Sequence, residues 1–309
     1  GWQCGSPPDP SSHFPIDFES ARTVSPAVHL RESPLGSYLY STSMRHGGEY
    51  GGVCQFETRR PQPGLVVVTG GSRGIGAAVA SRIAQLGHHV LINYAESREA
   101  AEQLTRRIHS ADGSVSLCKA DIGSEEGVMR LFATADAIGA PLAGLVNNAG
   151  VSGGFSRLED LSGSVLHHVL AVNVVGAMLC AREAVRRMST KHGKLGGTIV
   201  NVSSIAAKLG SAGEWIHYAA SKGAIDTLTI GLAREVAAEG IRVNAVAPGL
   251  IDTDFHAAAG APDRPARMAP DIPMARAGTP EEVADAILWL MSEQASYVTG
   301  AIVPVGGGR

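Results

Sequence analysis

Short apolar runs and longer stretches with helical spacing alternate along the chain from residue 65 to its end. The apolar runs are rich in β-branched residues and predict strands at 65–69, 90–93, 115–117, 144–147, 198–202, 243–246 and 301–305. The stretches between them predict helices at 75–86, 98–110, 125–138, 165–188, 218–238 and 280–291. Strands that alternate with helices are typical of a parallel sheet, and strands that are apolar throughout are covered on both faces. The pattern predicts one doubly wound, Rossmann-type α/β domain, with a seven-stranded parallel sheet and helices on both faces.

The first 63 residues do not follow this pattern. They contain scattered prolines and two Gly-Gly pairs, and they show no sustained apolar period. Such a composition buries too little apolar surface to offset the entropy lost on ordering. A secretory or transit peptide fits poorly, because the segment has acidic residues and no continuous apolar stretch. We therefore predict a disordered N-terminal extension at 1–63 and a folded domain at 64–309.

Composition limits the kinds of partner that the protein binds. The chain has 26 Lys and Arg against 29 Asp and Glu, whereas nucleic-acid and anionic-membrane surfaces need clustered positive charge. No uninterrupted apolar run has the 18 or so residues that a membrane span requires. The four cysteines have no metal-ligand spacing and are too few for a disulfide scaffold. We predict a cytoplasmic protein that binds a small molecule and no nucleic acid, membrane or metal.

The first predicted strand leads directly into a glycine-rich turn, Thr69-Gly70-Gly71-Ser72-Arg73-Gly74-Ile75-Gly76. Backbone N–H groups of such a turn and the positive end of the following helix can bind a pyrophosphate. Glycines also gather in ordinary tight turns, but the strand before and the helix after favour a dinucleotide site. The residues expected to bind the cofactor here are Gly70, Ser72, Arg73, Gly74, Ile75 and Gly76.

The next strand indicates which dinucleotide is bound. Folds that use NAD commonly carry an acidic residue about twenty positions beyond the glycines, where it binds the ribose 2′-hydroxyl. Here Asn93 and Tyr94 occupy that place, so no carboxylate repels a 2′-phosphate. Arg73 in the glycine turn could bind that phosphate through paired hydrogen bonds, although it could also be an ordinary exposed residue. The sequence favours NADP(H), with NAD(H) as the alternative.

A tyrosine and a lysine four positions apart are the candidates for proton transfer. Tyr218 and Lys222 lie on one face of a predicted helix, and a neighbouring ammonium is expected to lower the pKa of the phenol from its usual value near 10. Tyr218 could then act as general acid toward a carbonyl or as general base toward an alcohol. Ser203 and Ser204 end the preceding strand, and either hydroxyl could bind the same substrate oxygen.

In this order, the glycine turn, Asn147-Asn148-Ala149-Gly150, Asn201-Val202-Ser203-Ser204 and Tyr218-Ala219-Ala220-Ser221-Lys222 resemble the short-chain dehydrogenase/reductase family over residues 65–309. Residues 213–228 are most similar to a bacterial subgroup described as sugar dehydrogenase-like or acyl-carrier-protein reductase-like. The resemblance implies that Ser204 is the catalytic serine and that Lys222 also contacts the nicotinamide ribose. It implies that Asn173 orients a water in a proton relay, although Asn173 could instead be a helix-bending or capping amide. Further cofactor contacts implied by the resemblance are Asp121, Ile122, Asn148, Ala149, Gly150, Tyr218, Pro248, Gly249, Ile251 and Thr253.

A long loop predicted at 254–279 follows the segment expected to reach the nicotinamide, and long loops beside a site often act as lids. The side chains expected to line the substrate cleft are Phe155, Trp215, His217, Phe255, His256 and Met274. His217 is expected to be a wall residue, because Tyr218 and Lys222 already supply the proton chemistry. Apolar and small residues continue around the two long helices, and the resemblance implies a homotetramer or homodimer formed through them.

These observations lead to one principal hypothesis of function and two alternatives. The principal hypothesis is an NADP(H)-dependent oxidoreductase that interconverts a ketone and a secondary alcohol by hydride transfer. One alternative is an NAD-dependent sugar or polyol dehydrogenase that uses the same residues. The other is a dinucleotide-sensing module without turnover, although such a sensor would not need Asn173, Ser204, Tyr218 and Lys222.

Overall fold

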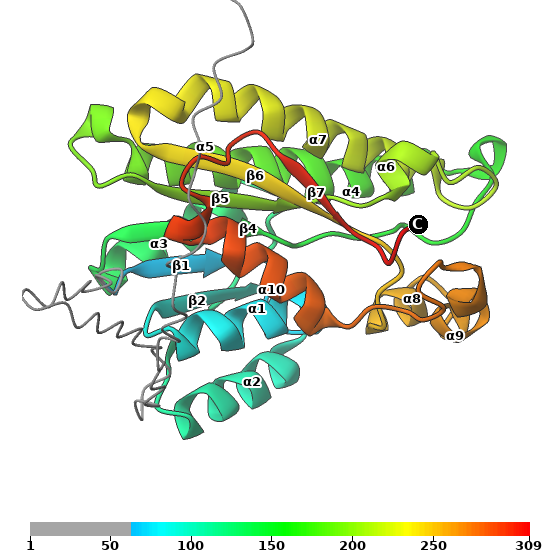
Figure 1. The fold of residues 1–309 in the computed structure, drawn as a ribbon, viewed down its shortest axis with the longest axis horizontal. Helices are drawn as coiled ribbons and strands as arrows, with labels where there is room; N and C mark the ends of the chain where they lie inside the picture. The colour runs from blue at the N-terminus through cyan, green and yellow to red at the C-terminus, as the bar shows by residue number, and fades with distance from the viewer. Residues whose placement is uncertain (1–62) are drawn as a thin grey trace, which may run out of the picture. The chain divides into compact units, whose positions relative to one another are not determined.

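The computed structural model describes residues 63–309, so nearly all of the predicted N-terminal extension lies outside the described residues. Seven strands form one parallel sheet in the order β3-β2-β1-β4-β5-β6-β7 (Figure 1). They are β1 (Leu65–Val68), β2 (His89–Tyr94), β3 (Ser114–Lys119), β4 (Leu142–Asn147), β5 (Gly197–Val202), β6 (Ile241–Pro248) and β7 (Ile302–Val305). The predicted doubly wound fold is confirmed. The strand order reverses between β1 and β4, and such a switch point is where open α/β sheets bind ligands.

Helices cover both faces of the sheet. One face is covered by α3 (Glu125–Ile138), α5 (Ala177–Met188) and α7 (Ile216–Val236), and the other by α1 (Gly74–Gln85), α2 (Arg98–Ser110) and α10 (Pro280–Met291). The shorter helices are α4 (Gly163–Leu170), α6 (Ala206–Leu209), α8 (Asp254–Ala258) and α9 (Arg264–Met268). Short 3₁₀ turns lie at Leu158–Asp160, Thr190–His192, Ala237–Glu239, Ala269–Asp271 and Glu293–Ala295.

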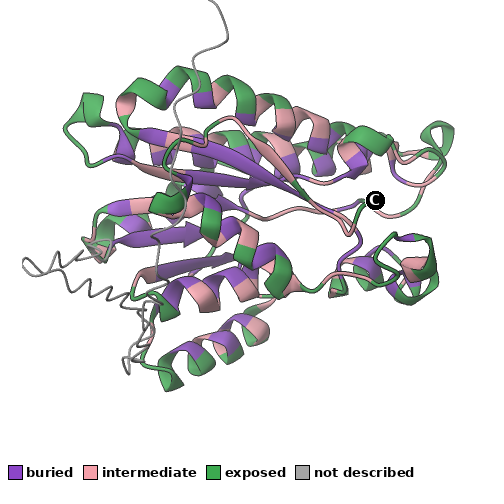
Figure 2. Cartoon of the chain, in the orientation of Figure 1, coloured by how far each residue is buried: buried purple, intermediate pink, exposed green. Residues whose placement is uncertain are grey.

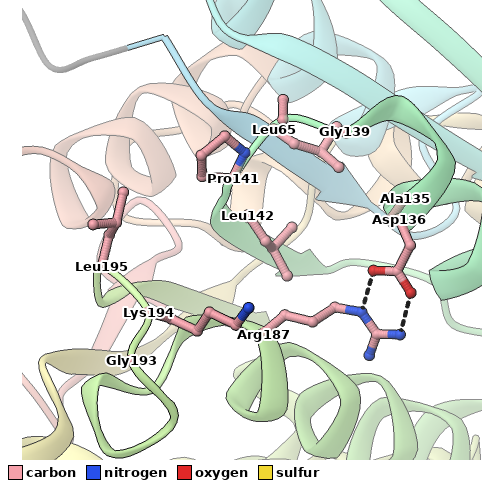
Figure 3. A pocket seen from close by; sticks show the side chains of 11 residues that line it. Leu65, Ala135, Asp136, Gly139, Pro141, Leu142, Arg187, Gly193, Lys194 and Leu195 are labelled. Carbon is pink, nitrogen blue, oxygen red and sulfur yellow. Dashed lines mark hydrogen bonds and ion pairs between the residues drawn. The ribbon is translucent and has the colours of Figure 1, made fainter.

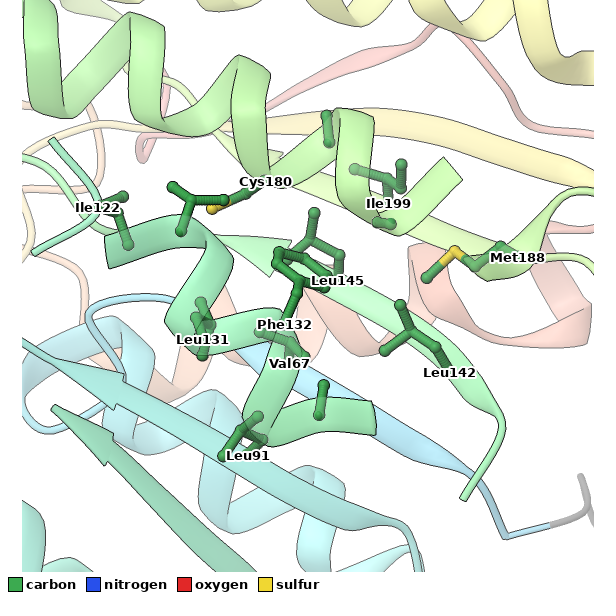
Figure 4. Packing of buried hydrophobic residues seen from close by; sticks show 14 of the residues in the cluster. Val67, Leu91, Ile122, Leu131, Phe132, Leu142, Leu145, Cys180, Met188 and Ile199 are labelled. Carbon is green, nitrogen blue, oxygen red and sulfur yellow. The ribbon is translucent and has the colours of Figure 1, made fainter. Parts of the chain in front are cut away.

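The strands β1 to β6 contribute side chains to two separate cores, and β7 packs against one of them. Along β1, Val67 packs into the core under α3 and α5, whereas Val66 and Val68 pack into the core under α1 and α10. The central strands are accordingly buried along most of their length (Figure 2). Phe132 of α3 lies in the middle of the first core, fully excluded from solvent (Figure 4). Burial of a side chain of this size contributes roughly 1.5–3 kcal/mol, so these cores hold the strand ends in place.

The helix predicted at 165–188 is interrupted. A π-helical turn, Ala171–Gly176, separates α4 from α5, and Asn173 lies within it. By length and composition the whole segment Gly163–Met188 could cross a membrane, but Cys180 and Met188 of α5 are fully buried in the core. A core helix passes the same test, so the segment is weak evidence for a membrane span.

The region predicted as a long loop after β6 contains ordered turns. We call residues 254–279 the lid segment, which includes α8, α9 and the 3₁₀ turn Ala269–Asp271. Thr253 begins α8 by accepting a hydrogen bond from the backbone N–H of Phe255. The lid segment is therefore a folded element beside the carboxyl end of the sheet.

Candidate active site

Three groups of candidate residues lie just beyond the carboxyl ends of three adjacent strands. The glycine turn follows β1, the segment 148–150 follows β4, and Ser203 and Ser204 follow β5. Because these strands flank the switch point, the topology alone brings the three segments together.

The glycine turn has the backbone geometry of a phosphate cradle. Gly70 and Gly74 have φ angles of +60° and +52°, in the left-handed region that side chains disfavour. A Cβ atom on Gly76 would lie only 2.5 Å from the carbonyl oxygen of Gly70. Arg73 is the N-cap residue of α1, and its side chain accepts no hydrogen bond from the first turn of the helix. The N–H groups of that turn are therefore available to an anion. These features fit the pyrophosphate of a dinucleotide, and Ser72 and Ile75 lie half-buried along the same turn.

Side-chain hydrogen bonds join the glycine turn to the segment that follows β4. The Thr69 hydroxyl accepts hydrogen bonds from the N–H groups of Asn148 and Ala149, at 3.0 and 3.1 Å. The Asn148 amide donates in return to the carbonyl oxygens of Thr69 and Gly70, at 2.9 and 3.0 Å. The glycine turn and the segment after β4 therefore form one connected unit.

Asn93, near the end of β2, forms hydrogen bonds that hold the same turn. Its side-chain oxygen accepts a hydrogen bond from the N–H of Gly70 at 3.3 Å, and its amide donates to the carbonyl of Ala120 at 2.8 Å. Asn93 and Tyr94 are both buried, and the end of β2 carries no carboxylate. Asn93 thus shapes the site through the glycine turn.

Arg73 is exposed, and its guanidinium lies 3.9 Å from the carboxylate of Asp254 at the start of the lid segment. An exposed pair of this kind contributes little, about 0–1 kcal/mol, so the guanidinium can exchange this partner for a phosphate. After β3, Asp121 is exposed and Ile122 is buried next to it.

The segment after β6 reaches the glycine turn from the far side. Gly249 donates its N–H to Val305, and its Cα packs so closely on the chain near Gly306 that a Cβ would come within 2.6 Å. Ile251 is buried, and the methyl group of Thr253 would be 3.4 Å from a Cβ on Gly74. Pro248 ends β6. The segment after β6 therefore meets the glycine turn at Thr253.

Ser204 and Tyr218 face each other, and Ser203 does not take part in this contact. The Ser204 hydroxyl lies close enough to the Tyr218 phenol to act on its pKa, in the lowering direction. Ser203 is buried and donates to the carboxylate of Asp226 at 2.5 Å. Lys222 lies one turn beyond Tyr218, with its Nζ 5.7 Å from the centre of the phenol ring and 2.7 Å from the carbonyl oxygen of Val202. The geometry thus favours Ser204 over Ser203 as the serine beside the reacting oxygen.

Burial controls the acidity of both proton-transfer candidates. It raises the pKa of Tyr218 to about 12, against the opposing effect of the Ser204 hydrogen bond. It lowers the pKa of Lys222 to about 8, against the opposing charge of Asp226. The sequence-based expectation that the pKa of Tyr218 is lowered is therefore wrong for this structure, because desolvation of the phenolate is the largest effect on it. At neutral pH the phenol keeps its proton and is ready to donate it.

Asn173 joins the segment after β4 to the helix that carries Tyr218. Its side-chain oxygen accepts from the N–H of Val151 at 2.8 Å, and its amide donates to the Val151 carbonyl at 2.9 Å and to the Ser221 hydroxyl at 3.0 Å. A Cβ on Gly150 would lie 3.4 Å from both Asn173 Oδ1 and Lys222 Nζ, so these residues are close neighbours. The side-chain amide already has protein partners, which gives Asn173 a bracing role in addition to any contact with water.

Aromatic side chains surround Tyr218 on its outer side. The ring centres of Trp215 and Phe255 each lie 5.6 Å from that of Tyr218, and Phe155 stacks on Trp215 at 4.6 Å. His256 is buried 6.4 Å from Trp215, ring centre to ring centre. Of the other residues expected to line the cleft, His217 bonds through Nε2 to the carbonyl of Ser152 at 2.8 Å, which agrees with a wall residue, and Met274 is exposed.

Two further residue pairs were not predicted from the sequence. Asp226, four residues after Lys222, carries the opposing charge that acts on that lysine, and the helical spacing of the two residues could have indicated it. Glu214 forms a two-point ion pair with Arg264, each contact 2.7 Å long. Fifty residues separate these two in the chain, so no local pattern could indicate their contact.

A cavity of about 340 Å³ lies at the other end of the sheet (Figure 3). Its lining includes Leu65 and Leu142, which begin β1 and β4, and the ion pair between Arg187 and Asp136 at 2.7 Å. Since the candidate residues lie at the carboxyl ends of the strands, this cavity is not part of the site.

Comparisons with known proteins agree with the geometry. A family model described as enoyl-(acyl carrier protein) reductase matches residues 70–309. The chain is 51% identical over 245 residues to the uncharacterized oxidoreductase YgfF of Escherichia coli (strain K12), covering 79% of this chain and 99% of that protein. It is 37% identical over 242 residues to glucose 1-dehydrogenase 2 of Bacillus subtilis (strain 168), covering 78% and 93%. A solved short-chain dehydrogenase from Burkholderia cenocepacia J2315, in complex with NADP, matches with a TM-score of 0.74 and 31% identity, covering 81% of this chain and 99% of that one.

The fold and the site together define a dinucleotide-binding oxidoreductase that acts on alcohol and carbonyl groups. The chain belongs to the short-chain dehydrogenase/reductase family.

Proposed function

We propose that the protein is an NADP(H)-dependent enzyme that interconverts a ketone and a secondary alcohol, with Tyr218 as the general acid and base. The observation that carries this proposal is the meeting of Ser204, Tyr218 and Lys222 beside the glycine turn at the switch point of the sheet. A non-catalytic sensor would have no use for a buried phenol with a serine partner and an amine one turn away.

The cofactor, when bound, supplies or accepts the hydride. In the reducing direction the Tyr218 hydroxyl donates its proton to the carbonyl oxygen of the substrate, and the Ser204 hydroxyl donates a hydrogen bond to the same oxygen as negative charge develops on it. Lys222 places a positive charge near the phenolate that forms. Asn173 fixes the distance between the helix that carries Tyr218 and the segment after β4.

Three observations support NADP(H) over NAD(H). The end of β2 carries no carboxylate, the Arg73 guanidinium is exposed beside the glycine turn, and one solved relative was obtained in complex with NADP. An NAD-dependent sugar or polyol dehydrogenase remains the second candidate, and similarity to a glucose dehydrogenase favours it.

We also propose that copies of the chain associate through the face formed by α5 and α7, as a dimer or tetramer in the cytoplasm. Val175, Met178 and Ile230 are large apolar residues that lie exposed on these helices and the π turn before α5. A charged substitution, Met178→Glu, should lower the oligomeric state in analytical ultracentrifugation. Wild-type protein that is monomeric at micromolar concentration would contradict this part of the proposal.

The test of function is turnover of carbonyl compounds with NADPH and NADH. Tyr218→Phe should lower kcat by about 10²–10⁴-fold, and Ser204→Ala should lower it far more than Ser203→Ala. Arg73→Ala should raise the KM for NADPH and leave the KM for NADH nearly unchanged. Tight cofactor binding without turnover of any ketone, sugar or acyl thioester would favour the sensor instead.

A further inference from the structure

One face of α7 is joined to the carboxyl end of β5 by a row of side-chain hydrogen bonds. The α7 residues of this row are three or four positions apart, as side chains on one side of a helix are. The bonds join Thr229 to Asn201 at 2.9 Å, Asp226 to Ser203 at 2.5 Å, and Lys222 to the carbonyl oxygen of Val202 at 2.7 Å. These contacts set the position of α7 along the end of the strand.

The bond between Ser203 and Asp226 has a carboxylate as its acceptor, and hydrogen bonds to ionised groups are stronger than neutral ones. The backbone N–H of Ser203 donates to Val246 of β6 at 2.8 Å, so Ser203 is also held to the sheet. Its hydroxyl lies 3.3 Å from the carbonyl oxygen of Lys222 as well. Ser203 therefore connects the sheet to the turn of α7 that carries Lys222 and Asp226.

The hydroxyls of Ser204 and Tyr218 are carried by the two elements that this bond connects. Ser204 directly follows Ser203, and its hydroxyl accepts a hydrogen bond from the N–H of Ala206 at 3.1 Å, so its position follows the backbone there. Tyr218 is on the same helix as Asp226, eight residues or about 12 Å earlier. If α7 shifts along the strand end, it carries the phenol with it, and the distance to the Ser204 hydroxyl changes.

We propose that Ser203 and Asp226 are positioning residues, whose hydrogen bond sets the distance between the Tyr218 and Ser204 hydroxyls. This inference rests on the proposed function, because it assumes that these two hydroxyls meet the reacting oxygen of the substrate. The two adjacent serines then have separate roles, since one holds the helix and the other contacts the substrate. A displacement of about 1 Å in a reacting group lowers the rate by up to about 10²-fold, and we expect a smaller displacement with a loss of about tenfold.

Alanine variants test the bond from both ends. Ser203→Ala and Asp226→Ala should each lower kcat about tenfold, while the affinity for NADPH stays near the wild-type value because other residues hold the glycine turn. The double variant should be no slower than Asp226→Ala, since the two residues act through one bond. The assay follows the loss of NADPH absorbance with 4-nitroacetophenone and ethyl acetoacetate as ketone substrates. A double variant slowed by the product of the two single effects, or wild-type kcat in Ser203→Ala, would overturn the inference.

Asp226→Asn separates the hydrogen bond from the charge. The amide oxygen of asparagine accepts the same Ser203 hydroxyl, so this variant should keep kcat within about threefold of the wild type. A loss as large as that of Asp226→Ala would mean that the charge matters and the bond does not, which also overturns the inference.

A second serine–carboxylate bond of the same length provides the matched control. Ser189 donates to Glu239 at 2.5 Å, but Ser189 follows α5 and Glu239 precedes β6, so this bond lies at the other end of the sheet. Ser189→Ala should lower the urea midpoint about as much as Ser203→Ala and leave kcat unchanged. An equal loss of kcat in both variants would reduce the role of Ser203 to general stability and overturn the inference.

Urea unfolding and NADPH affinity report whether each variant is folded. If Asp226→Ala does not fold, the comparison of Ser203→Ala with Ser189→Ala decides the question. An active wild type with unaltered kcat in the Ser203 variant refutes this inference alone. Wild-type protein that turns over neither ketone nor any compound of a wider carbonyl panel refutes the proposed function, and the inference with it.

Discussion

Replacement of Lys222 by methionine should stabilise the protein while it removes activity. The Lys222 side chain is almost fully buried, and burial lowers its pKa from 10.5 to about 8. One pKa unit corresponds to about 1.4 kcal/mol, so at neutral pH the charged lysine costs the folded state about 3 kcal/mol. Methionine has a similar length without the charge, but it loses the 2.7 Å hydrogen bond to Val202, a cost of about 1 kcal/mol. The expected net gain in unfolding free energy is about 2 kcal/mol.

The pH dependence of this gain tests its cause. Since the pKa of Lys222 is lower in the folded state, the unfolded chain holds a proton that the folded chain has lost between about pH 8 and the ordinary lysine value. The wild type therefore becomes relatively more stable as the pH rises through this window, and the advantage of the variant should shrink by about 2 kcal/mol between about pH 7 and about pH 9.5. The raised pKa of Tyr218 acts only above about pH 10, outside this range.

Urea unfolding followed by circular dichroism, without cofactor, gives the free energies at both pH values. Lys208→Met is the matched control, because Lys208 is exposed and its replacement should change stability little at either pH. A Lys222→Met variant that is no more stable than the wild type at neutral pH, or whose advantage does not change with pH, would refute the reasoning from burial.

Three further substitutions test other parts of the structure. Glu183 is buried with its carboxylate paired to three arginines of α5, so Glu183→Ala should cost about 3–5 kcal/mol of unfolding free energy in urea; a loss below about 1 kcal/mol would contradict this. Phe132→Ala should cost a similar amount, about 3–5 kcal/mol, by leaving a cavity in the core, and an unchanged midpoint would show that the core collapses around it. Gly76→Ala places a Cβ 2.5 Å from the carbonyl oxygen of Gly70, so NADPH affinity in a fluorescence titration should fall about tenfold or more; wild-type affinity would exclude the proposed cradle.

The sheet could be predicted from the sequence because its information is local. Each strand is a short apolar run, and the glycine turn stands directly between a strand and a helix, so neither depends on distant residues for its identification. The predicted ends were least accurate for β6, which extends two residues further in each direction than the 243–246 run. Arg242 is the second residue of β6, and its polar side chain interrupts the apolar run. Its guanidinium donates to backbone carbonyls at the end of α10, and a contact between such distant segments cannot be predicted from the local pattern.

The features that escaped prediction depend on contacts between distant segments. The π turn contains Asn173, whose partners Val151 and Ser221 are 22 and 48 residues away. The lid segment gains its order partly from the pair of Arg264 with Glu214. The pKa of Tyr218 was predicted in the wrong direction because helical spacing indicates a neighbouring charge but not the degree of burial.

The residues around Tyr218 come from two different parts of the fold. Its proton-transfer partners are fastened to the sheet, through Ser204 at the end of β5 and the hydrogen bond from Lys222 to Val202. Phe255, by contrast, belongs to the lid segment, and these contacts do not involve it. Substitutions at Phe255 can therefore change the surroundings of Tyr218 while the hydrogen bond that holds Lys222 to β5 stays in place.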